Sequence, residues 1–380
     1  MFRLMFRTYS LRLKPTARQT RQLNAALTIC CDLYNAALQE RREAWTTQRR
    51  SISYPMQCRQ LTELRAEDPG IRAIPVDLAR EPLRRVRRAF AGFFRRVKAG
   101  QKPGYPRFRS RERYSSLAIH APNFRIEGRT LLVSTLGGFR FQAHRELRGV
   151  PKSLTLVASG KKWLGRVVLD VGPAPEKRAV DTDVGIDVGL SSFAVLSDGS
   201  EVPNPRFLRK SEEEIARCNR RLARKQRGSR NRRKARLALR RAYERVAGRR
   251  RNFCHHISKG LVSQYDLIAF EKLQIREMVG GKLSKSILDA AWGELTRQIA
   301  YKAEEPGRWA VPVNPRNTTQ ACSACGRRVE KSLVDRWHAC ECGLSVSRDH
   351  NAALNILALG RTAAGLLPPK VSKLEHYPVT

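Results

Sequence analysis

Three carboxylates stand at the ends of apolar segments in the second half of this 380-residue chain. Asp187 lies in the run VGIDVGLSSFAVLSDG, Glu271 ends the run LIAFE, and Asp349 opens the amphipathic segment DHNAALNIL. Each alone could be a helix cap or a surface acid. Together they match the hard oxygen ligands of Mg²⁺, and two-metal phosphodiester cleavage needs carboxylates that hold two ions about 3.5–4 Å apart. The three acids therefore predict a two-metal Mg²⁺ site.

Cysteine spacing predicts a second metal site, between the second and third acids. Four of the nine cysteines form a C-x-x-C pair and a C-x-C pair, each followed by Gly: Cys322, Cys325, Cys340 and Cys342. Four thiolates in two short loops suit a closed, structural Zn²⁺ site. Because the second pair is one residue short, His338 could replace one thiolate, and the absence of metal is a third alternative. The remaining cysteines are expected to be packing residues: Cys30, Cys31, Cys58, Cys218 and Cys254.

Positive charge dominates the composition. The chain has 74 Lys and Arg against 34 Asp and Glu, a formal net charge of +40 and a sequence pI near 11. Residues 210–251 hold 18 Lys or Arg against four Glu. If this segment were only a solvated surface, its positive side chains would repel one another, so contact with phosphates is favoured. A nucleic acid is the expected partner. An anionic membrane is disfavoured because no run approaches about 18 apolar residues.

The N-terminal sequence MFRLMFRTYSLRLKP alternates apolar and basic side chains as a strand does. It lacks the apolar region and the cleavage site of a signal peptide. We therefore expect a cytoplasmic protein, and a reducing compartment also favours metal binding over disulfide formation.

The pattern along the chain predicts two differently built parts. Residues 16–50 and 76–98 have helical periodicity, 100–116 read as a basic loop, and six β-rich runs over 116–171 predict a small barrel or sandwich. The first strand could complete that sheet, with the helices as an insertion. The proline-bearing stretch 172–183 predicts a domain boundary. An α/β pattern follows it, and Gly228-Ser229 is expected to split the basic segment into two helices.

An ordered series of motifs runs along nearly the whole chain: RLKPTARQ, YNAAL, KPGYPRFRS, GIDVGLSSFAVLSDG, RGSRNRRKAR, FEKL, TTQACSACG and SRDHNAALNIL. In these motifs the sequence resembles the TnpB (OrfB) family of transposon-encoded RNA-guided DNA endonucleases, which are related to the type V CRISPR effectors. The resemblance implies that Asp187, Glu271 and Asp349 are the catalytic acids of a split-triad RuvC nuclease. It also implies a zinc finger inserted before the third acid.

The fold implied by this resemblance is multi-domain α+β. It would contain a β-barrel wedge domain (1–14 and 100–178), an inserted helical recognition domain (15–99), an RNase H-like (RuvC) α/β nuclease domain (179–316 and 345–360), a zinc finger (317–344) and a flexible C-terminal tail (361–380).

The resemblance further implies a guide RNA from the transposon end and a double-stranded DNA target beside a short motif that the protein reads. We expect a prokaryotic, nucleoid-associated monomer. Nucleic-acid contacts are expected from Tyr54, Arg80, Arg107, Arg109, Arg227, Arg230, Asn231, Lys234 and Arg348. Tyr54 and Arg80 would contact the flanking motif, and packing beside Pro55 is the alternative for Tyr54.

Two features depart from the family pattern. Ser347 stands where the family often has an acid two residues before the third catalytic one, and the second cysteine pair is short. Neither removes a catalytic group, so an active endonuclease is the leading hypothesis. The alternatives are a guided DNA-binding protein that does not cut, a CRISPR-linked miniature effector with the same residues, and a zinc-bearing RNA-binding protein. Arg348 and Asn351 could orient a phosphate or the third acid, or could serve only as helix-end polar residues.

Overall fold

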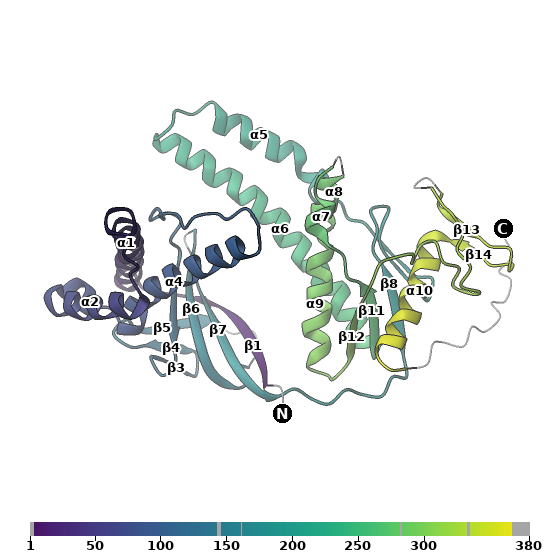
Figure 1. Cartoon of the computed structure of the whole chain (residues 1–380), viewed down its shortest axis with the longest axis horizontal. Helices are drawn as coiled ribbons and strands as arrows, with labels where there is room; N and C mark the ends of the chain where they lie inside the picture. Colours follow the sequence, from purple (N-terminus) through teal and green to yellow (C-terminus); the bar gives the residue numbers. More distant parts are fainter. Residues whose placement is uncertain (1–3, 143–145, 161, 282, 333–334, 367–380) are drawn as a thin grey trace. The chain divides into compact units, whose positions relative to one another are not determined.

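The chain consists of two compact units. The computed structural model describes residues 4–142, 146–160, 162–281, 283–332 and 335–366, and its contacts separate Met1–Pro173 from Ala174–Thr380 (Figure 1). Each unit buries its own set of apolar side chains. The division lies within residues 172–183, where Pro and polar residues end the preceding strand.

A seven-stranded antiparallel sheet forms the base of the first unit. Its strands are β1 (Leu4–Leu13), β2 (Ser116–His120), β3 (Phe124–Glu127), β4 (Thr130–Val133), β5 (Gly137–Gln142), β6 (Val150–Ser159) and β7 (Lys162–Pro173). Their order is β2-β6-β7-β1-β5-β4-β3, so the first strand of the chain lies inside the sheet. Leu11 and Leu13 of β1 are buried and Arg12 is exposed, as expected of a strand with one face on a core.

This sheet is open in the described residues. β2 and β3 are its edge strands, and no strand pairing joins them. All six β-rich runs predicted over 116–171 form strands, but the closed barrel that the resemblance implied is not seen. A barrel would need its two edges to pair, since closure is what removes sheet edges.

Four helices lie between β1 and β2. The two predicted ones form as α1 (Ala17–Gln48) and α4 (Val76–Lys98). Thr16 and Gln19 cap α1 reciprocally: the Gln19 amide donates to Thr16 Oγ1 at 3.2 Å, and the Thr16 amide donates to Gln19 Oε1 at 2.9 Å. The other two, α2 (Tyr54–Glu67) and α3 (Pro69–Arg72), were not predicted. Ser53 caps α2 and Asp68 caps α3, and each helix has Pro in its first turn.

The second unit contains a five-stranded sheet with both faces covered (Figure 1). Its order is β10-β9-β8-β11-β12, formed by β8 (Asp183–Asp187), β9 (Ser192–Leu196), β10 (Glu201–Pro203), β11 (Leu267–Glu271) and β12 (Trp309–Val313). β11 is parallel to both β8 and β12. On one face pack α6 (Arg230–Gln264) and α9 (Trp292–Glu304), and on the other packs α10 (Arg348–Ala363). The expected α/β pattern is confirmed.

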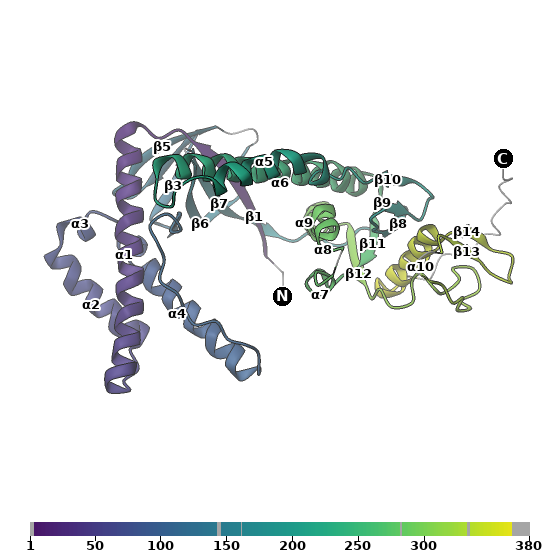
Figure 2. The same ribbon diagram turned by 90° about the horizontal axis from the view of Figure 1, so that it is seen from above.

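The basic segment forms a helical hairpin. α5 (Glu212–Ala223) lies alongside α6, as Figures 1 and 2 both show. The predicted break is confirmed: Gly228 takes a φ of 85°, and the Ser229 side chain caps α6 by accepting from the Arg232 amide. A small apolar cluster of Ile215, Ala242 and Val246 holds the two helices together.

The remaining elements of the second unit are short. They are the 3₁₀ turn η1 (Arg209–Ser211), α7 (Ile275–Met278), α8 (Ser284–Ala290) and the hairpin β13 (Trp337–Ala339) and β14 (Ser345–Ser347). α10 continues to Ala363, so residues 361–363 are helical and not part of a tail; residues 367–380 of the expected tail lie outside the described residues. Within the described chain, the helices are all too short or too polar to span a bilayer.

Candidate functional site

Strand alternation places the first two acids on one face of the five-stranded sheet. β8 and β11 are parallel neighbours with Ile186 paired to Phe270, so Asp187 and Glu271 end adjacent strands at the carboxyl edge of the sheet. Side chains alternate between faces along a strand. Asp187 and Glu271 therefore share the face of Gly185 and Ala269, which is the face that α10 covers.

The third acid reaches this edge because α10 packs unusually close to the sheet. A Cβ atom on Gly185 would lie 2.0 Å from the Ala353 carbonyl oxygen, and one on Gly360 would lie 2.3 Å from the Ala269 Cβ. Only glycine allows these two approaches. Asp349 lies in the first turn of α10, next to the sheet edge where the other two acids end.

Two contacts fix the start of α10. The Ser347 side chain accepts a hydrogen bond from the His350 amide at 3.2 Å and caps the helix. His350 Nε2 lies 3.1 Å from the Ser197 carbonyl oxygen, which follows β9. Ser347, where the family often has an acid, thus has a capping role, and Asp349 is held on a defined turn.

The electrostatics show that Asp187 lies close enough to the other two acids to be repelled by both. Burial, and then the negative charges of Glu271 and Asp349, raise the pKa of Asp187 to about 8. The Arg348 guanidinium and a hydrogen bond from the Val188 amide act in the opposite direction. Burial also raises the pKa of Glu271, although a hydrogen bond from the Thr318 hydroxyl opposes this shift.

A divalent cation fits this donor set. Asp187 is only 8% exposed, so water stabilises its charge poorly. The described residues supply one nearby guanidinium, that of Arg348, whose Nε lies 3.3 Å from Asp349 Oδ1. Carboxylate oxygens with surplus negative charge are the ligands that Mg²⁺ prefers.

The four cysteines of the two pairs come together as the sequence predicted. Their Sγ atoms all lie within 4.8 Å of one another, with 3.6 Å between those of Cys322 and Cys342 and 3.6 Å between those of Cys325 and Cys340. Tetrahedral zinc with bonds of about 2.3 Å would place neighbouring sulfurs about 3.8 Å apart. The donor set therefore fits structural Zn²⁺.

The alternative zinc ligand is not part of this cluster. His338 is fully buried in β13, and its Nδ1 contacts the Lys331 ammonium. The C-x-C pair closes because Gly343 follows it in the left-handed region, with a φ of 90°. The shortened second knuckle thus still brings both of its thiols to the first pair.

The predicted nucleic-acid contacts in the first unit fall in two places. Tyr54 begins α2 and is partly buried, with the Arg87 guanidinium 5.5 Å from its ring centre, and Arg80 is half-buried on α4. Arg107 and Arg109 are exposed in the basic loop. These two arginines line a hollow of about 570 Å³, whose lining in the described chain includes six arginines and no acid: Arg88, Arg95, Arg96, Arg107, Arg109 and Arg113.

The other predicted contacts lie in the second unit. Arg227 is in the turn between α5 and α6, and Arg230, Asn231 and Lys234 are exposed on the first turns of α6. Arg348 is the only one of the nine placed beside the acids. Within the second unit these residues therefore lie in two places, at the start of the basic hairpin's long helix and beside Asp349.

Sequence reasoning missed the roles of three residues that organise these sites. Asn35 pairs with the backbone of Arg109, donating from Nδ2 to its carbonyl at 2.9 Å and accepting from its amide at 2.9 Å, and so anchors the basic loop. Thr318 contacts Glu271. Asn351, expected to orient a phosphate or the third acid or to be polar helix surface, is instead fully buried against the first cysteine pair. The only sequence signal that could have identified these residues is their place in the motifs YNAAL, TTQAC and DHNAAL.

Models of known families match most of the chain. Residues 166–281 match OrfB_IS605, described as "Probable transposase", and residues 292–356 match the "Cas12f1-like, TNB domain". Residues 1–50 match HTH_OrfB_IS605, described as "Helix-turn-helix domain". The described part of that last segment contains β1 and α1, one strand and one helix.

Named relatives cover nearly the full length. "Putative RNA-guided DNA endonuclease" of Streptomyces pristinaespiralis is 31% identical over 98% of this chain and 94% of its own length. "Putative RNA-guided DNA endonuclease InsQ" of Escherichia coli K12 is 26% identical, covering 93% and 92%. Among solved structures, a Cas12f1–sgRNA–target DNA complex matches with a TM-score of 0.60 at 12% identity, over 93% of this chain and 98% of that one, so the folds are alike.

Proposed function

The chain belongs to the TnpB (OrfB) family of RNA-guided DNA endonucleases, and we propose that it cleaves double-stranded DNA complementary to a guide RNA from the transposon end, next to a short flanking motif. The observation that carries this proposal is that Asp187 and Glu271 end adjacent strands of the five-stranded sheet, with Asp349 close enough to act on the charge of Asp187. A buried acid repelled by two others, in a protein of net charge +40, is best explained by a cation-dependent phosphodiester hydrolase.

In this proposal the five-stranded sheet and α10 form an RNase H-like (RuvC) nuclease domain, over 179–316 and 345–360. Asp187, Glu271 and Asp349 would hold Mg²⁺, which when bound supplies Lewis acidity to the attacking water and the leaving oxygen. The chain's own part is to converge the carboxylates and to keep Arg348 beside them, where a scissile phosphate would need a positive charge.

The finger, residues 317–344, is proposed to be held by structural zinc on the four cysteines. Such a site contributes directly to the stability of a small loop region that has few apolar contacts of its own. The finger precedes Asp349 in the chain, so its fold determines the position of the residues that lead into α10.

The arginine hollow of the first unit is proposed to bind a nucleic-acid backbone. Six guanidinium groups line the hollow and suit successive phosphates, although that of Arg88 is also ion-paired to Glu81. The exposed ring of Phe108 on the same hollow suits stacking on a base. Tyr54 and Arg80 stay proposed contacts to the flanking motif. The first unit would then provide the wedge (1–14 and 100–178) and recognition (15–99) domains.

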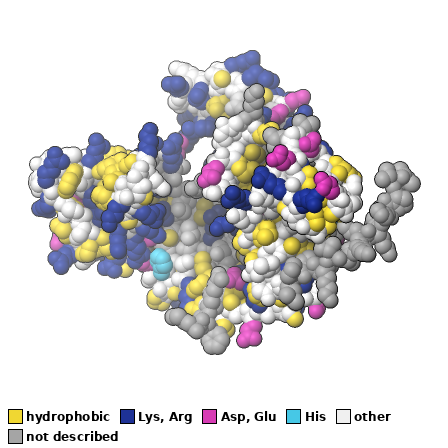
Figure 3. Space-filling model, turned by 45° about the vertical axis from the view of Figure 1, so that its right-hand side comes forward, with side chains coloured by type: hydrophobic (Ala, Val, Ile, Leu, Met, Phe, Trp, Pro, Cys, Tyr) yellow, Lys and Arg dark blue, Asp and Glu magenta, His cyan; other side chains and the backbone are white. Residues whose placement is uncertain are grey.

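The basic hairpin of α5 and α6 is proposed as a further phosphate-binding surface. On the face drawn in Figure 3, Lys and Arg side chains gather in patches and acidic side chains are fewer. Arg230, Asn231 and Lys234 lie exposed at the start of α6, where the macrodipole also favours anions.

To test this proposal, the protein is expressed together with the DNA that flanks its gene, and the RNA that co-purifies with it is sequenced. The purified complex is then given plasmids that carry the complementary target beside a randomised motif. With Mg²⁺, the wild type is expected to linearise a subset of plasmids that share one motif. Asp187→Ala should lose cleavage but retain guide-dependent binding. Glu201→Ala is the matched control, because Glu201 is an exposed acid of the same sheet that contacts Ser192.

Uncut plasmid for every motif would contradict the endonuclease, and retained guide-dependent binding in that case would favour the guided DNA-binding alternative. Loss of binding by Asp187→Ala would show that this acid is structural. The origin of the co-purified RNA, a transposon end or a repeat array, distinguishes the family member from a CRISPR-linked effector.

A further inference from the structure

The segment that joins β12 to the first cysteine pair contacts one of the acids directly. Thr318 is only 3% exposed, and its Oγ1 lies 2.7 Å from Glu271 Oε1 and 3.0 Å from the Pro315 carbonyl oxygen. The hydroxyl has one proton, and an ionised carboxylate is the stronger of these two acceptors. Donation to Oε1 leaves the second oxygen of Glu271 available to a cation.

The same segment is held by the helix that carries Asp349. Asn355 Nδ2 donates to the carbonyl oxygens of Thr318 and Ala321, at 2.8 and 2.7 Å. Asn351 Nδ2 donates to the Ala321 carbonyl at 2.8 Å, and its Oδ1 accepts from the Ser323 amide at 2.9 Å. These two side chains thus bind the backbone on both sides of Cys322.

The contacts form a continuous path that links the second and third acids. It runs from Glu271 on β11 to Thr318, from the Thr318–Ser323 backbone to Asn351 and Asn355 on α10, and along α10 to Asp349. Asn351 is completely buried, so water cannot replace its bonds without opening the structure. Cys322 lies inside this path and is 1% exposed.

We propose that Thr318 is a positioning residue for Glu271, and that Asn351 and Asn355 make the first cysteine pair a structural part of the acid site. The finger would then do more than contact nucleic acid: its folded state would set the distance between the second and third acids. This inference rests on the proposed function, because it assumes that the three acids bind a divalent cation.

The alternative for Thr318 is a purely local role, in which its hydroxyl closes the turn through Pro315. The two roles differ in one respect. A turn-closing hydroxyl affects only the stability of the segment, whereas a hydroxyl that orients a metal-binding carboxylate also affects how tightly the acids hold the ion. Removing an outer-shell partner of a metal ligand typically weakens binding by about 10–100-fold.

The experiment measures Mn²⁺ binding to the full-length purified chain by electron paramagnetic resonance, with no nucleic acid present. Thr318→Val keeps the shape and removes the hydroxyl, and is expected to weaken Mn²⁺ binding about tenfold. Thr318→Ser keeps the hydroxyl and should bind within about twofold of the wild type. Asn355→Ala, whose side chain bonds to the finger backbone, should weaken binding about threefold while the zinc content, measured by mass spectrometry, stays unchanged.

Asp187→Ala separates the two proposals. If it binds Mn²⁺ as tightly as the wild type, the acids do not hold the ion and both proposals are wrong. If Asp187→Ala loses binding while Thr318→Val keeps it, only the positioning role is overturned. The same conclusion follows if Thr318→Ser weakens binding as much as Thr318→Val, because the hydroxyl would then not be the group that matters.

Discussion

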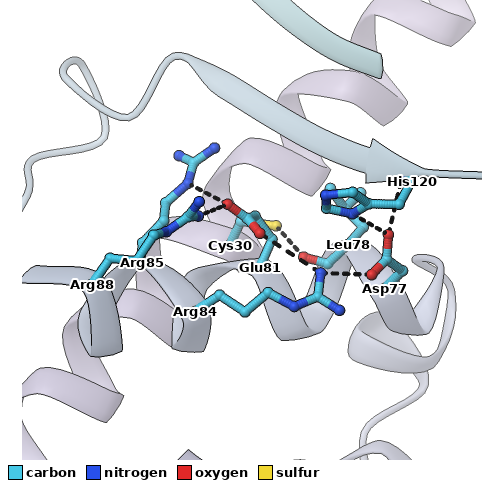
Figure 4. A network of polar contacts seen from close by, with 8 residues as sticks. All are labelled: Cys30, Asp77, Leu78, Glu81, Arg84, Arg85, Arg88 and His120. Carbon is cyan, nitrogen blue, oxygen red and sulfur yellow. Dashed lines mark hydrogen bonds and ion pairs between the residues drawn. The ribbon is translucent and has the colours of Figure 1, made fainter. Parts of the chain in front are cut away.

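Each unit contains a group of buried carboxylates, and the two groups have opposite electrostatic surroundings. On α4, Asp77 and Glu81 are surrounded by positive groups (Figure 4). The Arg84 guanidinium lies 2.6 Å from Asp77, the His120 amide donates to Asp77 at 2.9 Å, and Glu81 is ion-paired to Arg85 and Arg88. Burial alone would favour neutral Asp77, but the hydrogen bonds from Arg84 and His120 outweigh it and lower the pKa of this carboxyl.

Asp187 is buried to the same extent as Asp77, at 8% exposure, yet its pKa is raised to about 8. Burial is the first cause, and the second is repulsion by two other acids, with Arg348 opposing both. The comparison teaches that burial alone does not identify a functional acid. The α4 acids are neutralised by their own chain, whereas Arg348 is the guanidinium that opposes the raised pKa of Asp187 at the sheet edge.

The largest expected effect is on cleavage. Asp187→Asn preserves shape and removes one ligand charge, so we expect cleavage to fall by about 10³-fold or more. Asp77→Asn, at the same exposure, should leave the rate per folded molecule within about threefold of the wild type. Rates from a plasmid assay, normalised to the folded fraction, test the pair. Equal losses in both variants would remove the distinction between the two groups.

A second large effect should follow from moving α10. A methyl group on Gly185 cannot fit against the Ala353 carbonyl, so Gly185→Ala should displace the helix and Asp349 with it. A shift of about 1 Å commonly costs about 10²-fold in rate. Gly248→Ala on α6 is the control, because nothing lies within 4 Å of its added Cβ. Wild-type cleavage by Gly185→Ala would contradict the close packing of α10.

Thermodynamic stability should change in opposite directions in the two groups. Glu81→Gln removes the buried charge that pairs with the Arg85 and Arg88 guanidinium groups and should lower the free energy of unfolding by about 2–3 kcal/mol. Asp187→Asn removes the need to protonate this carboxyl on folding and should raise the free energy of unfolding of the metal-free protein by about 4 kcal/mol at pH 7. Denaturant titration in a metal-chelating buffer measures both. Changes of the same sign would contradict the comparison.

The smallest effect is a pH dependence. Because the pKa of Asp187 is about 8 in the folded protein and about 4 in the unfolded chain, folding takes up a proton between these values. The metal-free wild type should therefore lose stability relative to Asp187→Asn as pH rises from about 4 to 8, with no further change above. Melting temperatures of both proteins across this range check the slope. A difference that is constant with pH would mean that Asp187 is not perturbed.

Much of the acid site could be predicted from sequence because its determinants are local. Apolar runs place Asp187 and Glu271 at strand ends, and pair spacing alone brings the four thiols within reach of one another. The approach of α10 depends instead on Gly185 and Gly360 meeting their neighbours across space. Likewise, Asn351 looks like a helix-surface residue, and only tertiary contacts reveal that it holds the cysteine loop.

The parts that were missed have weak local signals. α2 has poor apolar periodicity, and its Ser53 cap and early Pro resemble an ordinary turn. The barrel was implied by resemblance, but closure depends on pairing between β2 and β3, which short alternating runs cannot specify. The Thr318 contact joins residues 47 positions apart and has no signature in either motif.

Melting wild type and Asp187→Asn with and without millimolar Mg²⁺ shows whether the sheet-edge acids bind a cation. An ion that binds only the folded state stabilises it in proportion to its affinity. We expect Mg²⁺ to raise the melting temperature of the wild type by several degrees and to leave that of Asp187→Asn unchanged. An equal rise in both proteins, or none in either, would contradict the account.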